Sequence, residues 1–117
     1  MLKQESGGVI LGMSSVCGLN GHSGTASYNF TKAGVISLTR TVATEYRKRK
    51  IRMNCLCPGT TETPLVKNFV ENSPPGIREV LHNLMPVPGL IQPFHVGQVA
   101  AMLCANNTYL TGVALPI

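Results

Sequence analysis

The strongest constraint on the fold is a long helical pattern between two short apolar runs. Residues 9–13 are continuously apolar and follow two glycines, and residues 51–57 are mostly apolar and end at a Pro-Gly pair. Such runs between turn signals are typical of strands buried on both faces of a parallel sheet. Between them, apolar residues recur at three- and four-residue steps from 27 to about 49, which indicates a helix. This β-α-β order predicts parallel strands and a right-handed crossover.

The second half of the chain continues the same α/β pattern. Residues 94–105 return to helical spacing, and residues 112–116 are a third strand candidate. We expect a second right-handed crossover between the last two strands. The intervening residues 60–93 hold six of the eight prolines, which predicts two short helices joined by proline-bearing turns. An apolar, irregular segment after a strand's carboxyl end is a candidate lid over a binding cleft.

Composition narrows the class of protein. The chain has 117 residues, of which 44% are hydrophobic and 13% are charged, as expected for a single globular domain. No apolar run approaches the roughly 20 residues that cross a bilayer, and the first residues lack a signal-peptide pattern. We therefore expect a soluble, cytoplasmic protein without a membrane span.

The cysteines and the basic residues carry no site of their own. The four cysteines form no C-x-x-C pair and have no histidine at ligand spacing, so no metal site is predicted. Cys55 and Cys57 share one face of their strand and are expected to be buried, reduced thiols. Five of the ten basic residues gather at 47–52, where a helix end stabilises cations. A solvated helix end is favoured there over a nucleic-acid or membrane-surface site, because no aromatic residues interleave.

The candidate site lies between residues 14 and 32. A Gly- and Ser-rich loop begins where the first strand ends, at the edge where open α/β sheets bind ligands. Tyr28 and Lys32 are four residues apart and share one helix face. A cation beside a phenol favours the phenolate, which suits an acid/base catalyst, and Ser15 could hydrogen-bond a substrate oxygen. Taken alone, such a pair is more often a solvated helix face.

Four motifs in register resemble the carboxyl-terminal half of the short-chain dehydrogenase/reductase domain. Residues 10–16 (Ile-Leu-Gly-Met-Ser-Ser-Val) resemble the strand that ends in that family's catalytic serine, and Tyr28 with Lys32 resembles its Tyr-x-x-x-Lys helix. Residues 54–64 resemble its Pro-Gly turn with a following threonine, and residues 111–116 its last strand. Because order and intervals agree over nearly the whole chain, the resemblance favours a catalytic interpretation of Tyr28 and Lys32.

The resemblance implies a fold and a set of roles. The fold would be the carboxyl-terminal half of a Rossmann-like, doubly wound parallel sheet, with the amino-terminal half absent. Residues 1–117 would be a partial domain, with 60–93 as the substrate lid. Tyr28 would be the general acid/base, Lys32 would favour its phenolate, and Ser15, with Ser14 as the neighbouring candidate, would orient the substrate oxygen. Cofactor contacts would come from Tyr28, Lys32, Pro58, Gly59, Thr61 and Thr63. Thr63 also suits a helix N-cap, since a proline follows it.

Two functions remain open at this level. The first is an NAD- or NADP-dependent oxidoreductase of an alcohol or ketone. The second is a catalytically silent fragment or short isoform that associates through the helix at 27–49, as a homo-oligomer or an interaction partner. The family's Gly-rich pyrophosphate turn is not present in this sequence, and Gly12 stands where many members have asparagine. We therefore expect weak dinucleotide binding and no turnover by these 117 residues alone.

Overall fold

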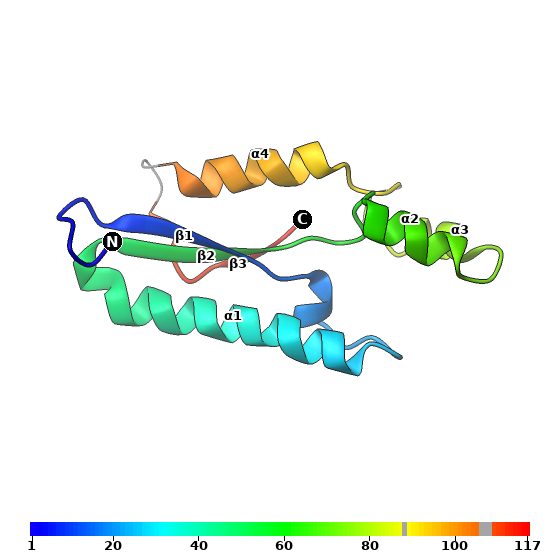
Figure 1. Cartoon of the computed structure of the whole chain (residues 1–117), viewed down its shortest axis with the longest axis horizontal. Coiled ribbons are helices and arrows are strands. Elements are labelled where there is room, and N and C mark those ends of the chain that lie inside the picture. The colour runs from blue at the N-terminus through cyan, green and yellow to red at the C-terminus, as the bar shows by residue number, and fades with distance from the viewer. Residues whose placement is uncertain (88, 106–108) are drawn as a thin grey trace.

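The computed structural model describes residues 1–87, 89–105 and 109–117, and it contains a three-stranded sheet between two helical layers (Figure 1). All strands are parallel, in the order β1-β2-β3. Helix α1 covers one face, helix α4 covers the other, and α2 and α3 lie beyond the carboxyl end of β2 (Figure 1). The elements are β1 (Gly8–Met13), α1 (Ala26–Tyr46), β2 (Ile51–Cys57), α2 (Pro64–Glu71), α3 (Ile77–Asn83), α4 (Pro93–Cys104) and β3 (Ala114–Pro116). Short 3-10 turns occupy Val16–Gly18 and Arg47–Arg49.

The predicted strands and helices are confirmed, including the two short helices in the proline-rich segment. Proline occupies the first turn of both α2 and α4, where its missing N–H costs nothing and its fixed φ suits the helix. The basic residues Arg47–Arg49 form the 3-10 turn that follows α1, and Lys50 stops the helical path in a left-handed conformation with φ 55°. Within the described residues, no helix is both long and apolar enough to cross a membrane.

Strand β2 is the buried centre of the sheet. Cys55 and Cys57 face α1 and pack with Ile36, whereas Arg52 and Asn54 make their hydrogen bonds to segments at the end of α4 and before β3. Successive side chains of a strand point to opposite faces, so the two sets separate. All four cysteines are free, and these two are buried as expected, although Cys104 is exposed.

The burial predicted for the first strand is wrong. The residues of β1 are only partly buried, and Met13 is 48% exposed. The reason is its place at the outer edge of this sheet, where only β2 pairs with it. A continuous apolar run does not distinguish a central strand from an edge strand.

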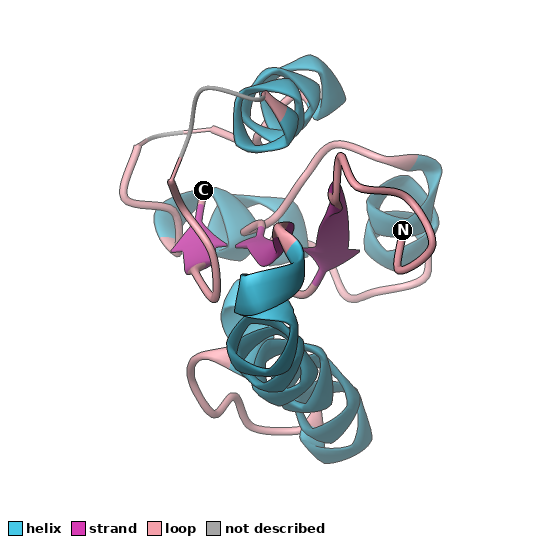
Figure 2. Ribbon diagram, turned by 90° about the vertical axis from the view of Figure 1, so that its left-hand side faces the viewer, coloured by secondary structure: helices cyan, strands magenta, loops and turns pink. Residues whose placement is uncertain are grey.

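The two crossovers have opposite hands. The chain steps in one direction from β1 to β2 to β3 through parallel strands, but α1 and α4 lie on opposite faces (Figures 1 and 2). The expectation of two right-handed crossovers is therefore wrong for one of them. The rule rests on a twisted strand that feeds directly into a packing helix. The β2–β3 connection departs from that case because α2 and α3 precede α4.

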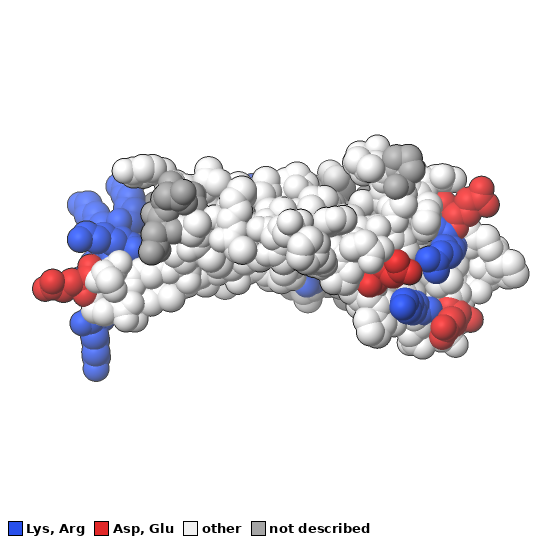
Figure 3. All heavy atoms as spheres, turned by 90° about the horizontal axis from the view of Figure 1, so that it is seen from above, with Lys and Arg blue, Asp and Glu red and all other residues white. Residues whose placement is uncertain are grey.

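Charged residues gather at the two ends of the molecule, and the surface between them is nearly uncharged in the view of Figure 3. At the amino end of the strands, a hollow of about 480 Å³ is lined mainly by basic residues. A side chain at Gly7 would collide with the carbonyl oxygen of Lys50, and Gly7 also has φ 72°. Glycine at this position lets the amino-terminal segment lie against the basic turn. The residues that line the hollow are Leu2, Lys3, Gln4, Glu5, Lys48, Arg49 and Lys50.

Candidate active site

The site forms where β1 and β2 leave the sheet together. Beyond the last paired residues, the Ser14 N–H donates to the Leu56 carbonyl at 2.7 Å, and the Val16 N–H donates to the Pro58 carbonyl at 3.1 Å. The loop after β1 and the Pro-Gly turn after β2 are therefore tied side by side. This pairing brings together two motifs that are far apart in the sequence, at the carboxyl edge predicted for ligand binding.

Tyr28 and Lys32 lie together on the first turns of α1, beside the end of β1. The Lys32 Nζ is 5.5 Å from the centroid of the Tyr28 ring and donates a hydrogen bond to the Met13 carbonyl at 3.1 Å. The Tyr28 side chain is 44% exposed, and Lys32 is half-buried. The predicted shared face is confirmed, and the phenol is accessible to a ligand.

The two neighbouring serines are buried but face different partners. The Ser15 hydroxyl accepts from the Cys17 N–H at 3.2 Å and donates to the Pro58 carbonyl at 3.5 Å. The Ser14 hydroxyl instead donates to the Lys32 carbonyl at 2.7 Å. Ser15 is therefore turned toward the Pro-Gly turn, whereas Ser14 is turned toward α1.

Hydrogen bonds fix the turn after β2 and the threonines that follow it. The Gly59 N–H donates to the Ile117 carbonyl at 3.0 Å, and the Thr61 hydroxyl donates back to the Gly59 carbonyl at 3.2 Å. The Thr63 hydroxyl accepts from the Val66 N–H at 3.4 Å, so the predicted helix cap is confirmed. The sequence places these residues near one another, and the structure fixes each through a different partner.

Met85 was not singled out from the sequence, yet it covers the Pro-Gly turn. A side chain at Gly59 would approach the Met85 Sδ to 2.9 Å, and the Thr60 N–H donates to the same sulfur at 3.3 Å. The segment predicted as a lid thus contacts the turn. An apolar cluster in the sequence was the only signal, and it does not specify which of its members reaches the site.

A polar contact closes the base of the same segment. The Glu62 carboxylate accepts hydrogen bonds from the Gln92 amide at 2.8 Å and from the Arg78 guanidinium at 3.1 Å. These two bonds hold the pKa of Glu62 below its ordinary value. The Glu62 N–H also donates to the Ile91 carbonyl at 2.8 Å. The ends of the lid segment are therefore joined to each other.

Asn54 is a second residue whose role the sequence did not reveal. It is fully buried, its Nδ2 donates to the Leu110 carbonyl at 2.8 Å, and its Oδ1 accepts from the Val113 N–H at 3.1 Å. The signal was present, because an amide in an apolar strand needs buried partners. Asn54 fixes the approach to β3 and, through it, the frame of the site.

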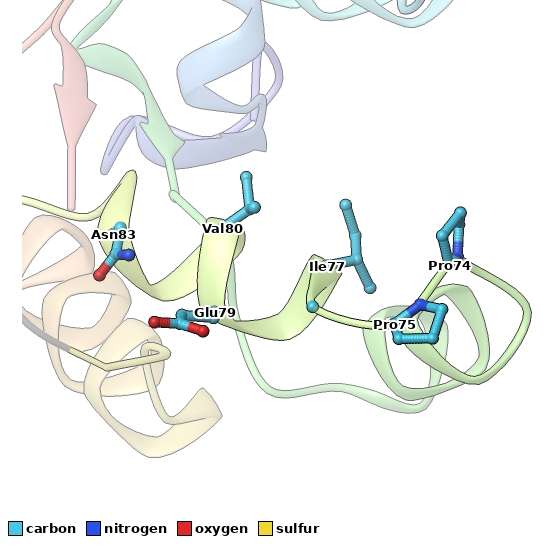
Figure 4. Close-up of a pocket in the computed structure, with 7 residues that line it drawn as sticks. Pro74, Pro75, Ile77, Glu79, Val80 and Asn83 are labelled. Atoms are coloured by element: carbon cyan, nitrogen blue, oxygen red, sulfur yellow. The ribbon is translucent and has the colours of Figure 1, made fainter.

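Two hollows of the molecule lie away from these residues. A depression of about 430 Å³ runs along α3 and the proline turn before it, with Pro74, Ile77 and Val80 in its lining (Figure 4). Neither this depression nor the basic hollow includes Tyr28 or Lys32. The chemistry of the candidate site therefore rests on the exposed phenol, the adjacent ammonium and the nearby serine.

Known proteins of one family resemble this chain over its whole length. A family model described as enoyl-(acyl carrier protein) reductase matches residues 1–117. The 3-oxoacyl-[acyl-carrier-protein] reductase FabG of Thermotoga maritima is 36% identical over 118 residues, which cover 100% of this chain and 46% of that protein. Oxidoreductase UcpA of Escherichia coli K12 is 33% identical over 96% of this chain and 44% of its own length.

A solved structure shares the fold. A 7α-hydroxysteroid dehydrogenase, determined in complex with NADH and 7-oxo glycochenodeoxycholic acid, superposes with a TM-score of 0.88 at 28% identity. The match covers 99% of this chain and 45% of that one. The chain thus spans about half the length of the curated relatives it matches.

Proposed function

The chain belongs to the short-chain dehydrogenase/reductase family, and from that premise we propose that it carries the catalytic part of an NAD- or NADP-dependent oxidoreductase of an alcohol or ketone. The observation that supports this most directly is the pairing of Tyr28 with Lys32 beside the end of β1. The pair combines an exposed phenol with a cation at the edge where α/β sheets bind ligands.

The residues of this edge suit a nicotinamide dinucleotide. An ammonium has three donors, and the Met13 carbonyl takes one of those of Lys32, so two can reach a ribose diol. The Thr61 and Thr63 hydroxyls flank the Pro-Gly turn and would border the ring with Pro58 and Gly59. When bound, the cofactor supplies or accepts a hydride.

The protein's own residues would manage the proton. In reduction, the Tyr28 hydroxyl donates its proton to the substrate oxygen, and in oxidation the phenolate takes that proton back. The Lys32 ammonium lies 5.5 Å from the centroid of the Tyr28 ring, beside the group that transfers the proton. The bond from Ser15 to the Pro58 carbonyl is long, at 3.5 Å, compared with about 2.7–2.8 Å for a typical O–H···O bond. The Ser15 hydroxyl can therefore leave it and donate to the substrate oxygen.

The test separates proton transfer from cofactor binding. Titration of the chain with NADH and with NADPH measures affinity, and a panel of ketones measures turnover. We expect weak binding by the 117 residues, and turnover once the amino-terminal part of the Thermotoga maritima relative precedes residue 1. In that chimera, Tyr28→Phe should lower kcat by about 10²- to 10⁴-fold and leave dinucleotide affinity nearly unchanged. Full activity in this variant would contradict the assignment.

A second role, association through α1, is supported by the outer face of that helix. Phe30 is 81% exposed and Leu38 is 55% exposed, and among the described residues nothing outside the helix lies within 4 Å of a Cβ placed on Gly34 between them. Residues four apart lie on one face, so these three form a stripe on which a second copy could pack. Leu38→Glu should convert oligomers to monomers in sedimentation velocity. An unchanged distribution of species would remove this role.

A further inference from the structure

Ser14, directly after β1, is hydrogen-bonded to Lys32 of α1, the residue whose ammonium belongs to the candidate site. Its side chain is 3% exposed, its N–H donates to the Leu56 carbonyl and its hydroxyl donates to the Lys32 carbonyl, both at 2.7 Å. A carbonyl has two lone pairs, so the Lys32 carbonyl can accept this bond in addition to its bond within the helix. The contact therefore adds a tie between strand and helix without removing one from the helix.

The loop after β1 presses on the same turn of the helix. A Cβ atom at Gly18 would lie 2.8 Å from the Lys32 carbonyl carbon and 2.8 Å from the Ser14 Oγ. Real Cβ atoms essentially never lie closer than 3.0 Å to such an atom, and both of these distances are shorter than that. Only glycine permits this approach, so Gly18 and Ser14 together define how closely α1 lies to the end of β1.

Lys32 is thus held at both ends. Its carbonyl oxygen accepts from the Ser14 hydroxyl. Its ammonium donates to the carbonyl of Met13, the residue before Ser14. A side chain as long as lysine needs a fixed backbone if its ammonium is to keep one position.

We propose that Ser14 is a positioning residue that fixes Lys32, and with it Tyr28 one turn earlier, against the end of β1. The two serines then divide the work: Ser14 holds the helix, and Ser15 is left to face the substrate. The catalytic meaning of this assignment rests on the proposed oxidoreductase function. The positioning itself can be measured in the absence of turnover.

The experiment compares Ser14→Ala with Thr39→Val. Thr39 is fully buried, and its hydroxyl donates to the Val35 carbonyl at 2.8 Å. Both variants therefore remove one buried hydroxyl that bonds a carbonyl of α1, but only Ser14 reaches the helix from the strand. Lysines are methylated reductively with ¹³C, and the Lys32 signal is assigned from its loss in Lys32→Arg. The Lys32 signal should move toward that of solvent-exposed lysines in Ser14→Ala and stay in place in Thr39→Val.

Amide hydrogen exchange gives a second readout. In Ser14→Ala, amides at residues 28–36 should exchange about threefold to tenfold faster, which corresponds to one lost hydrogen bond. In Thr39→Val this first part of α1 should not be selectively affected. A Lys32 signal and an exchange pattern that are the same in both variants would overturn the proposal.

A steric pair tests the same contact should Ser14→Ala fail to fold. Gly18→Ala should move the loop away from Lys32 and reproduce the displaced signal. Gly34→Ala is its control, because no atom of the described residues outside this helix lies within 4 Å of the added methyl group. An unmoved Lys32 signal in a folded Gly18→Ala variant would count against the proposal. Absence of any response of the unaltered chimera to NADH would overturn the proposed function instead, and the lysine signal would still decide the positioning.

Discussion

Helices α1 and α4 cover opposite faces of the same sheet, but different interactions hold them. On the α1 side, Ile36 packs against the Cys55 and Cys57 thiols. On the α4 side, the Arg52 guanidinium and the Asn54 amide bond to main-chain atoms at the end of α4 and before β3. Apolar packing tolerates small shifts, whereas a side-chain bond to a particular carbonyl specifies one register.

This contrast between apolar packing and side-chain hydrogen bonds explains why the hand of one crossover could be predicted from the sequence and that of the other could not. The β1–β2 connection is a single helix that packs by its apolar face, so periodicity in the sequence is sufficient to place it. The β2–β3 connection returns over the other face, and Arg52 donates to the Leu103 carbonyl at 3.2 Å and to the Ala105 carbonyl at 2.8 Å. Side-chain bonds of this kind, together with the fully buried Leu103, hold the end of this connection against the sheet.

The largest effect is expected from removing the buried amide. Asn54→Leu leaves the partly buried Val113 N–H without its acceptor and removes the bond to the Leu110 carbonyl. We expect the free energy of unfolding to fall by about 3 kcal/mol, measured by urea denaturation followed by circular dichroism. The Lys32 environment should change little, because α1 packs on the other face. A loss below about 1 kcal/mol would mean that the α4 side does not depend on this amide.

Arg52→Met should have the next largest effect. The variant keeps much of the apolar stem but loses bonds to the Leu103, Ala105 and Leu110 carbonyls. Hydrogen bonds from charged groups at a partly buried site contribute more than neutral ones, so we expect a loss of about 2 kcal/mol. Arg49→Met is the matched control, since Arg49 is exposed and donates to the Leu2 carbonyl at 2.9 Å. Equal losses in the two variants would contradict the special role of the α4 side.

A small change on the α1 side should cost less. Ile36→Val removes one methylene from the cluster around Cys55 and Cys57, and we expect a loss of about 1 kcal/mol. Thermal unfolding monitored by circular dichroism would measure it, with exposed Leu38→Val as the control. If Ile36→Val were more costly than Arg52→Met, the contrast between adaptable and specific packing would be wrong.

Ionisation of the buried Cys57 thiol should leave stability unchanged near neutral pH and lower it only at alkaline pH. Burial, assisted by the neighbouring Cys55, raises the pKa of Cys57 from 9.0 to about 11. Because the folded state holds the proton more tightly than the unfolded state, this contribution to stability is complete below pH 9 and is lost between about pH 9 and 11. Urea midpoints measured across that range should fall more steeply for the unaltered chain than for Cys57→Ala. Parallel pH profiles would refute the assignment of this loss to Cys57.

Most of the fold follows from local pattern. The order of strands and helices could be predicted because periodicity and turn residues act within a few positions of each other. The shared face of Tyr28 and Lys32 could be predicted for the same reason, since four residues make about one turn of a helix. The edge of the sheet that carries the site follows from parallel pairing.

What only the tertiary structure decided involves residues distant in sequence. The sequence around Ser14 and Ser15 does not specify which partner each hydroxyl bonds, yet one reaches Lys32 and the other reaches Pro58. Met85, within the lid segment, packs over Gly59. Helix α4 covers the face of the sheet opposite α1. Each of these depends on how separate elements pack, because alternation and helical spacing specify which side of an element is apolar but not which partner meets it.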